Sequence, residues 1–291
     1  MQQLLEILKA VLFGIVEGIT EWLPISSTGH MILLDELVSL QVGDAAFSEQ
    51  FYSMFEVVIQ LGAILAVILL FFHKLNPLAP SKTPEERRAT WILWAKVLLA
   101  IVPSGIVGVL ADDFVDNTLS HYAVVAAALI VYGVAFILIE RHRMAKGDTC
   151  AVTSVDAVSW RTAFMIGVFQ ILALIPGTSR SGSTILGAML LGLSRTAASE
   201  FSFFMAIPTM LGASLVRGYK FYSYVSEGAV AIPSLAWIVL AVGCLVAFAV
   251  SYLAIRFLMD FVKRHTFTVF GIYRIALGLL VLVWFGIRTA V

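Results

Sequence analysis

The chain has 291 residues, of which 60% are hydrophobic and 13% are charged, and its mean hydropathy is +0.96. Soluble domains are roughly 45–50% apolar and about 25% charged, so this composition excludes an ordinary soluble protein and indicates a polytopic membrane protein. The 19 Lys and Arg residues balance the 19 Asp and Glu residues, so no net charge favours a nucleic acid as partner. Cys150 lies in a polar loop and Cys244 in an apolar run, so we expect no disulfide between them. The N-terminus is not expected to be a cleaved signal peptide, because Glu6 and Lys9 interrupt its apolar stretch.

The first 40 residues are apolar but are broken in the middle by Pro24-Ile-Ser-Ser-Thr-Gly29. Each piece is shorter than the ~20 residues that a helix needs to cross a bilayer, which predicts a re-entrant helix–loop–helix hairpin. Hydroxyl side chains within the break can cap a second helix, which we expect to start near His30: Ser26, Ser27 and Thr28. Residues 41–50 are polar and predict a surface loop.

Six full membrane spans are predicted in the rest of the chain, near 52–72, 91–110, 122–140, 200–218, 234–257 and 267–288. Between the third and the fourth, a second broken apolar stretch at about 163–194 predicts another re-entrant hairpin, interrupted by Pro176–Thr184. Polar segments are expected to connect these elements as loops or linkers: 73–90, 111–121, 141–162, 219–233 and 258–266.

Loop charge predicts the orientation in the membrane. Lys and Arg are concentrated in loops 73–90, 141–162 and 258–266, whereas loop 111–121 has three aspartates and no Lys or Arg. Because cytoplasmic loops carry an excess of Lys and Arg, we expect the three basic loops in the cytoplasm and both termini outside. The first hairpin would then enter the membrane from outside and the second from the cytoplasm.

The two halves of the chain, about 1–145 and 155–291, resemble each other within a single membrane domain, 1–291. Phe13-Gly-Ile-Val-Glu17 is similar to Ile166-Gly-Val-Phe-Gln170, and a Pro–Ser motif breaks both halves. Each half would contain one hairpin and three spans, an odd number of crossings, so the second copy must be inverted. The predicted fold is therefore an all-α polytopic membrane protein, with six transmembrane helices and two re-entrant hairpins arranged as an inverted repeat, an architecture typical of transporters. The alternative is chance similarity between apolar segments.

Two carboxylates precede the first break, where ionisable groups at membrane depth indicate function. Glu17 and Glu21 are four residues apart, so on a helix they share one face. A divalent cation would relieve their mutual repulsion, and carboxylates together with substrate phosphates are typical ligands of Mg²⁺, so we expect Mg²⁺ or Ca²⁺ here. The alternative is a pair of water-facing glutamates near a helix end.

Both breaks open a helix, and free N–H groups at helix N-termini bind anions. Arg180 could clamp a phosphate with its guanidinium fork and offset charge in phosphoryl transfer, or it could form a structural ion pair with Glu17 or Glu21. His30 could act as nucleophile, as base for Ser27 or as acid for a leaving group, or be only structural. Arg274 lies deep in the last span and needs a partner, for which Glu56 and Glu200 are candidates.

The motifs from Glu17 to His30 and from Pro176 to Thr184 resemble the bacterial undecaprenyl-diphosphate phosphatase family, also called bacitracin resistance protein. The segments Ala198–Phe203 and Tyr273-Arg274 are similar as well, and the similarity covers essentially the whole chain. The resemblance implies an enzyme of the bacterial inner membrane, opening to the periplasm, that hydrolyses undecaprenyl diphosphate to the monophosphate and phosphate. It also implies that the carrier lipid is recycled for peptidoglycan synthesis, with roles in cell shape and bacitracin resistance.

Carried over by motif, Glu17 and Glu21 would serve a Mg²⁺ or Ca²⁺ ion. Four residues would be catalytic: Glu21, Ser27, His30 and Arg180. Six would bind the substrate: Ser26, Thr28, Gly177, Ser179, Ser181 and Thr184. The sequence leaves open which of Ser27 and His30 attacks, and it leaves the oligomeric state open, a homo-oligomer included.

Two other functions compete with this interpretation. A transporter or flippase for a phosphorylated polyprenyl lipid would bind without hydrolysis, and the repeat architecture favours that class. A phosphatase of the type-2 phosphatidic acid family is not favoured, because no histidine follows Ser179-Arg180 at the required spacing.

Overall fold

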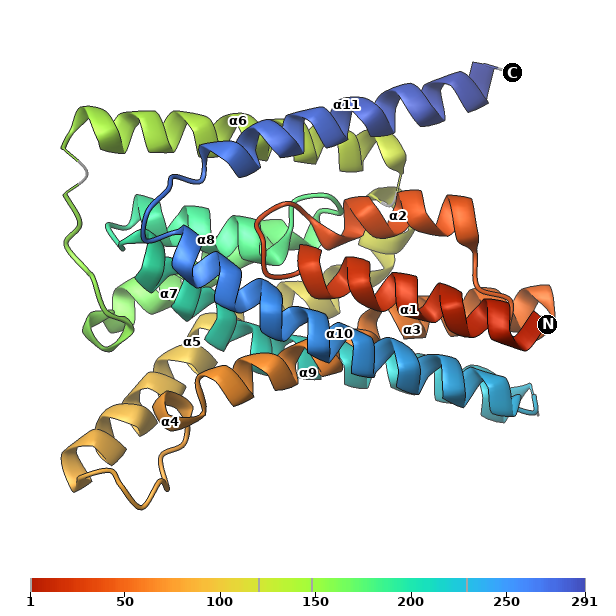
Figure 1. The fold of residues 1–291 in the computed structure, drawn as a ribbon, viewed down its shortest axis with the longest axis horizontal. Coiled ribbons are helices and arrows are strands. Elements are labelled where there is room, and N and C mark those ends of the chain that lie inside the picture. Colours follow the sequence, from red (N-terminus) through yellow and green to blue (C-terminus); the bar gives the residue numbers. More distant parts are fainter. Residues whose placement is uncertain (1, 120, 148, 229, 291) are drawn as a thin grey trace.

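The computed structural model describes residues 2–119, 121–147, 149–228 and 230–290. The regular secondary structure of the described residues is helical, apart from one isolated bridge between Val152 and Leu193. Figure 1 shows the α-helices in chain order: α1 (Gln2–Thr20), α2 (Ser27–Val38), α3 (Ala45–Leu70), α4 (Phe72–Leu75), α5 (Pro84–Phe114), α6 (Tyr122–Ala145), α7 (Trp160–Ile171), α8 (Arg180–Leu190), α9 (Arg195–Glu227), α10 (Ser234–Phe261) and α11 (Thr268–Ala290). Short π and 3₁₀ turns cover Val115–Leu119, Val155–Ala157 and Leu172–Leu174. The all-α prediction is confirmed.

Within the described residues, six helices are long and apolar enough to cross a membrane, as predicted. These are Ala45–Leu70, Pro84–Ala111, Tyr122–Ala145, Arg195–Glu227, Ser234–Phe261 and Thr268–Ile287. The centres of the predicted spans agree with these helices, but several of the predicted boundaries differ from the observed ones.

The segments predicted as loops are longer than the observed connections, because N-cap residues and polar helix ends resemble loops in composition. Helix α3 starts inside the expected loop 41–50, where the Asp44 side chain accepts the Phe47 N–H at 2.7 Å. Helix α9 continues through Pro208 to Glu227, so most of the expected linker 219–233 is helical. Loop 73–90 likewise contains α4 and the start of α5, and part of loop 111–121 is helical. The aspartate side chains of that last segment lie outside the described part of the chain: Asp112, Asp113 and Asp116.

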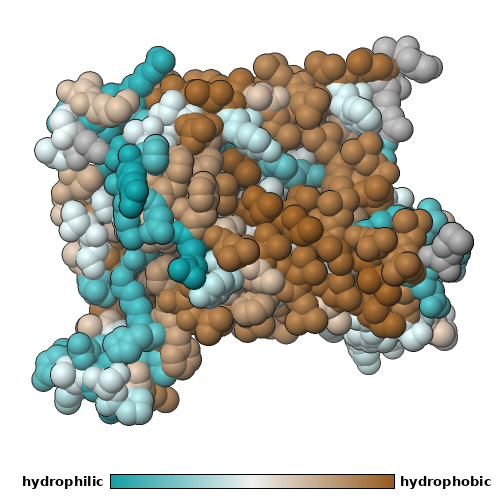
Figure 2. All heavy atoms as spheres, in the orientation of Figure 1, coloured by the Kyte–Doolittle hydropathy of each residue, from teal (hydrophilic) through white to brown (hydrophobic). Residues whose placement is uncertain are grey.

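Large apolar side chains cover the outer surface of the helices. Leu110 is 82% exposed, Val109 75% and Leu215 67%. On the face shown in Figure 2, hydrophobic residues form a continuous expanse, and hydrophilic residues gather at one end, over the α4–α5 region and its neighbours. Such a large exposed apolar surface is expected where lipid is the solvent.

The short helix α8 lies in the interior. Helix α8 is buried from Ser181 to Met189, between α7 and α9. Helix α1 packs against α10, and α7 packs against α5. Both contacts depend on a glycine, because a Cβ at Gly14 would lie 2.8 Å from the Gly243 carbonyl and one at Gly167 would lie 1.9 Å from the Ala100 carbonyl. Small residues that allow close backbone approach are the usual way in which membrane helices associate.

Candidate active site

The two sequence breaks adopt the same local structure. Ser26 has φ 75° and Ser179 has φ 72°, and no other non-glycine residue in the described ranges has positive φ. Each serine is an N-cap: Ser26 Oγ accepts the Gly29 N–H at 3.3 Å, and Ser179 Oγ accepts the Gly182 N–H at 3.1 Å. Left-handed backbone costs a non-glycine residue roughly 1–2 kcal/mol, and such strain clusters at functional sites. Helix α2 therefore begins at Ser27 rather than near His30 as predicted.

Arg274 holds the two breaks together. Its side chain is fully buried, and it donates to the Pro24 carbonyl at 3.1 Å and to the Gly177 and Thr178 carbonyls at 2.9 and 2.8 Å. In the described part of the chain, no carboxylate lies within ion-pair distance of Arg274. The expected partner Glu200 instead binds Lys74 at 2.5 Å. The sequence suggested a carboxylate because it cannot show that backbone carbonyls converge on this guanidinium.

Gly177, predicted to bind substrate, has a clear conformational requirement. Its φ is +91°, and a Cβ there would lie 2.4 Å from the Val125 carbonyl on α6. Only glycine fits both the backbone angle and the space. In this structure the Gly177 carbonyl accepts a hydrogen bond from Arg274, and substrate binding by Gly177 stays a prediction.

Glu21 lies at the junction of the two breaks, in the turn that follows α1. Its Oε2 accepts the Ser27 hydroxyl at 2.7 Å, and its Oε1 accepts the Arg180 Nε–H at 3.3 Å. Its backbone carbonyl accepts the Ser181 hydroxyl at 2.9 Å. The structure thus brings Glu21, Ser27 and Arg180 into one cluster, although the two motifs are far apart in the sequence.

Arg180 has one end of its guanidinium available. Nη1 donates to the Ser202 carbonyl at 2.7 Å, and the guanidinium lies 5.9 Å from the centre of the Trp22 ring. Nη2 is buried and has no hydrogen-bond partner among the described residues. Leaving a buried donor unpaired costs about 1–3 kcal/mol or more for a charged group, which an anionic ligand would recover.

Glu17 lies one helical turn before Glu21 and is 1% exposed. It is within electrostatic range of Glu21, Glu56 and Arg180, and its Oε1 has no hydrogen-bond partner in the described chain. The described residues contain no group of three or more His, Cys, Asp and Glu side chains placed to hold a metal ion. Glu17 and Glu21 are the two carboxylates that a Mg²⁺ ion bound together with substrate phosphates would use, and a metal ion at this place stays a prediction.

His30 is oriented away from Ser27. Its Nδ1 lies 2.7 Å from the Ser26 carbonyl, and its Nε2 lies 2.7 Å from the Tyr273 hydroxyl. A carbonyl can only accept, so Nδ1 carries the proton and Nε2 accepts from tyrosine in the neutral ring. The His30 and Tyr273 rings also stack, with centres 5.6 Å apart and planes at 7°. The hydrogen bond to Ser27 that a base would make is supplied by Glu21.

The model for the family described as "Bacitracin resistance protein BacA" matches residues 10–280. The chain belongs to the BacA family. It is 56% identical to an undecaprenyl-diphosphatase of Lactiplantibacillus plantarum, over 97% of this chain and 98% of the relative. It is 52% identical to one from Limosilactobacillus fermentum, over 98% and 99% of the two chains. It is 50% identical to one from Enterococcus faecalis, over 93% and 94%.

The other predicted substrate ligands of this BacA-family chain fall into two groups. Ser179, Ser181 and Thr184 belong to the cluster, and the Thr184 hydroxyl lies 2.7 Å from that of Ser202. Thr28 differs, because its side chain is exposed. Contacts of these residues with substrate stay predictions.

Sequence reasoning missed Tyr273, Ser202 and Trp22 as members of this site. Tyr273 and Ser202 lie in segments already noted for their resemblance to the family, which was the only sign of their importance. Trp22 sits inside the first motif, but nothing in the sequence shows that its ring lies beside Arg180.

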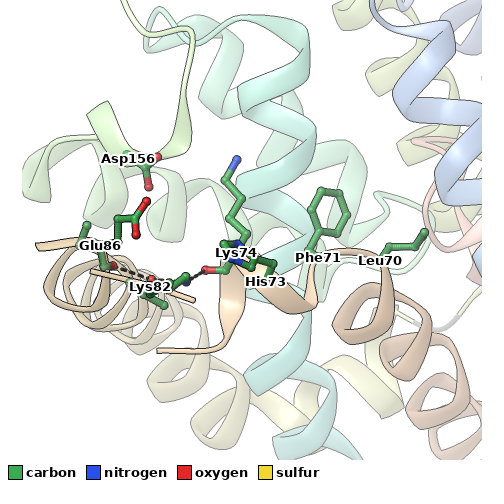
Figure 3. Close-up of a pocket in the computed structure, with 9 residues that line it drawn as sticks. Leu70, Phe71, His73, Lys74, Lys82, Glu86 and Asp156 are labelled. Atoms are coloured by element: carbon green, nitrogen blue, oxygen red, sulfur yellow. Dashed lines mark hydrogen bonds between the residues drawn. The ribbon is translucent and has the colours of Figure 1, made fainter. Parts of the chain in front are cut away.

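A pocket of about 430 Å³ lies elsewhere, at the α3–α5 connection (Figure 3). Lys82 lines it and donates to the Thr90 hydroxyl at 2.7 Å and to the Lys74 carbonyl at 3.2 Å. In the close-up, the carboxylates of Glu86 and Asp156 point toward one another. Because Lys82 and Lys74 are engaged by the protein itself, these contacts hold the connection in place.

Proposed function

We propose that this chain hydrolyses undecaprenyl diphosphate to undecaprenyl phosphate and inorganic phosphate, with the Glu21 cluster as active site. The activity is the one in the names of relatives that are 50–56% identical. One observation carries the assignment of the site: the Ser27 hydroxyl donates at 2.7 Å to a carboxylate that Arg180 also holds. A nucleophile within hydrogen-bond reach of a base, itself oriented by a third group, is typical of covalent catalysis.

In the proposed reaction, Ser27 Oγ attacks the terminal phosphorus and its proton passes to Glu21. The bond from this phosphorus to the bridging oxygen breaks, and undecaprenyl phosphate leaves with the proton that Glu21 took up, so that Glu21 is ionised again. Water then attacks the phosphoserine, with Glu21 taking its proton, to release inorganic phosphate and restore the serine. His30 would act as a second proton-handling group through Nε2 once its hydrogen bond with the Tyr273 hydroxyl is broken.

Positive groups would stabilise the charge on the transferred phosphoryl group. Arg180 Nη2 and the free N–H groups of the α2 and α8 N-termini are the candidates, since both helices begin in this cluster. Glu17, with Glu21 beside it, would hold a Mg²⁺ or Ca²⁺ ion that shields the negative charge of the diphosphate.

We also propose that α1–α2 and α7–α8 are re-entrant hairpins of an inverted repeat. The matched left-handed serines at 26 and 179 support the repeat. The glycine-dependent contacts of α1 with α10 and of α7 with α5 support it as well. Two short helices per half would meet at the active site near the middle of the membrane.

For localisation, we propose the bacterial inner membrane, with the site open to the periplasm. The three basic loops lie at one end of the molecule in Figure 1, and the α2–α3 connection and both labelled termini lie at the other. The positive-inside rule would place the basic end in the cytoplasm. In the periplasm the enzyme would recycle the carrier lipid for cell-wall synthesis and maintain cell shape.

A transporter or flippase of the same lipid is the second candidate, because the matched halves fit that architecture. It predicts that the lipid binds without release of phosphate.

The test is phosphate release from a C55 prenyl diphosphate by purified protein in detergent, with Mg²⁺, with Ca²⁺ and with EDTA. We expect metal-dependent release in the wild type and loss of at least two orders of magnitude in Ser27→Ala, Glu21→Gln and Arg180→Ala. Ser226→Ala, an exposed serine at the end of α9, is the matched control. Wild-type protein that binds the lipid but releases no phosphate would refute the enzyme and favour the transporter, and full activity of Ser27→Ala would refute the serine nucleophile.

A further inference from the structure

A second pocket, of about 440 Å³, lies where α2 meets α3. Its lining combines two carboxylates with hydroxyl and amide groups: Asp35, Ser39, Leu40, Gln41, Gly43, Ala45, Ser48, Glu49 and Tyr52. None of these described lining residues is basic. The neighbouring cation, Lys9, donates to the Ser39 carbonyl at 2.7 Å and forms an ion pair with Glu6 at 2.8 Å. The pocket is therefore acidic, and its nearest lysine is already neutralised.

One face of α3 leads inward from this pocket. Glu49, Tyr52 and Glu56 follow one another at spacings of three and four residues, which places them on the same side of the helix. Glu49 is exposed, whereas Tyr52 and Glu56 are half-buried. The face thus runs from the surface towards the interior and carries oxygen atoms along its length.

Tyr52 and Glu56 connect the pocket with the active site. Tyr52 is within electrostatic range of Asp35 of the pocket lining and also of Glu56 and Glu17. Its ring packs against Phe13 of α1 with centres 5.5 Å apart, and its hydroxyl donates to the Met31 carbonyl of α2 at 3.4 Å. Glu56 is in turn within electrostatic range of Glu17. The Glu49–Tyr52–Glu56 face of α3 therefore ends near the buried carboxylate of Glu17.

Glu17, at the inner end of this α3 face, gives independent support for a bound cation. Glu17 is 1% exposed, and its Oε1 has no hydrogen-bond partner in the described chain. Because a buried carboxylate oxygen without a partner is costly, a bound cation would stabilise it.

We propose that the Asp35–Glu49 pocket and the Glu49–Tyr52–Glu56 face of α3 form the access route by which a divalent cation reaches Glu17. The inference rests on the metal site of the proposed function. Clefts lined by charge of one sign concentrate counter-ions and raise association rates by about 10- to 1000-fold. The same acidic lining would disfavour the diphosphate, so cation and substrate would approach by different paths.

The experiment measures cation binding directly, without lipid and without turnover. Tb³⁺ replaces the hard divalent cation, and its luminescence, sensitised by nearby Trp and Tyr side chains, is followed by stopped flow in purified protein. Asp35→Asn/Glu49→Gln is compared with Glu85→Gln/Asp260→Asn, which removes the same charge from exposed positions of α5 and α10. Glu17→Gln tests the inner end, and gel filtration and circular dichroism establish that each variant is folded.

We expect the association rate constant of Asp35→Asn/Glu49→Gln to fall roughly threefold or more at low salt, while the α5/α10 control keeps the wild-type rate. The difference should disappear near 1 M salt, where the screening length is about 3 Å. Equal rates in both double variants, with binding lost in Glu17→Gln, would overturn the route and leave the metal site standing. Unchanged binding in Glu17→Gln would refute the metal site of the proposed function and the route with it.

Discussion

Arg274 should matter for stability as much as for chemistry, and Arg274→Lys tests this. The arginine makes three buried hydrogen bonds that join the two breaks, at 3.1, 2.9 and 2.8 Å. A lysine ammonium at the same place can reach only one of the two loops. About two charge-assisted bonds are then lost, and at about 1.5–3 kcal/mol each the cost is on the order of 3–6 kcal/mol.

Thermal unfolding in detergent, followed by intrinsic fluorescence, measures the expected loss. At about 2–4 °C per kcal/mol for a chain of this size class, the midpoint should fall by roughly 6–24 °C. Phosphate release should fall with it at temperatures where the variant is still folded, because Ser27 and Arg180 begin two different helices, α2 and α8, whose preceding breaks Arg274 joins. Arg256→Lys, at an exposed arginine of α10, is the control and should behave as wild type. A variant at position 274 with the wild-type midpoint and rate would refute the argument that Arg274 fastens the site.

Three further substitutions have defined outcomes. Gly177→Ala forces a Cβ against a carbonyl of α6 in a left-handed conformation and should lower the unfolding midpoint, whereas Gly212→Ala, where a Cβ has open space, should not. Glu140→Gln breaks the ion pair of the fully buried Glu140 with the partly buried Arg195 (2.8 and 2.5 Å) and should cost about 3–5 kcal/mol in denaturant or thermal unfolding; an unchanged midpoint would contradict the pairing. Tyr273→Phe removes the hydroxyl at His30 Nε2 and should change kcat by about tenfold or less without moving the midpoint, and a loss as large as that of Ser27→Ala would show that His30 is the essential group.

The sequence predicted the number of spans because a bilayer imposes a length and an apolar composition on each helix. It also located both breaks, since prolines and hydroxyl residues within apolar stretches are rare. Helix ends were less predictable. The N-cap at Asp44 and the polar last turns of α9 resemble loop in composition, but their backbone hydrogen bonds are helical.

The site could be assembled from sequence only as two separate motifs. Glu21, Ser27 and Arg180 were candidates individually, but the sequence could not show that Glu21 binds both of the others. It also could not show that the Tyr273 hydroxyl lies at His30 Nε2, or that backbone carbonyls accept from Nη1 and Nη2 of Arg274. Except for Glu21–Ser27, these pairings connect residues that are far apart in the chain, and those of His30 and Arg274 depend on the position of α11, which no local pattern encodes.

The charges of the cluster explain why a cation is expected in a site that binds an anion. Two carboxylates, Glu17 and Glu21, lie beside a single guanidinium whose Nε already serves Glu21. A diphosphate would add negative charge to a buried space in which carboxylates already outnumber the available positive groups, and such a charge is costly unless it is paired. Arg180 Nη2 can pair with one phosphate oxygen, and Glu17 has the unpartnered oxygen with which a divalent ion could pair the rest. In the proposed reaction the three groups would have separate roles: Glu21 would take the serine proton, Arg180 would bind the phosphoryl group, and Glu17 would hold the cation that allows a charged lipid head to enter an acidic site.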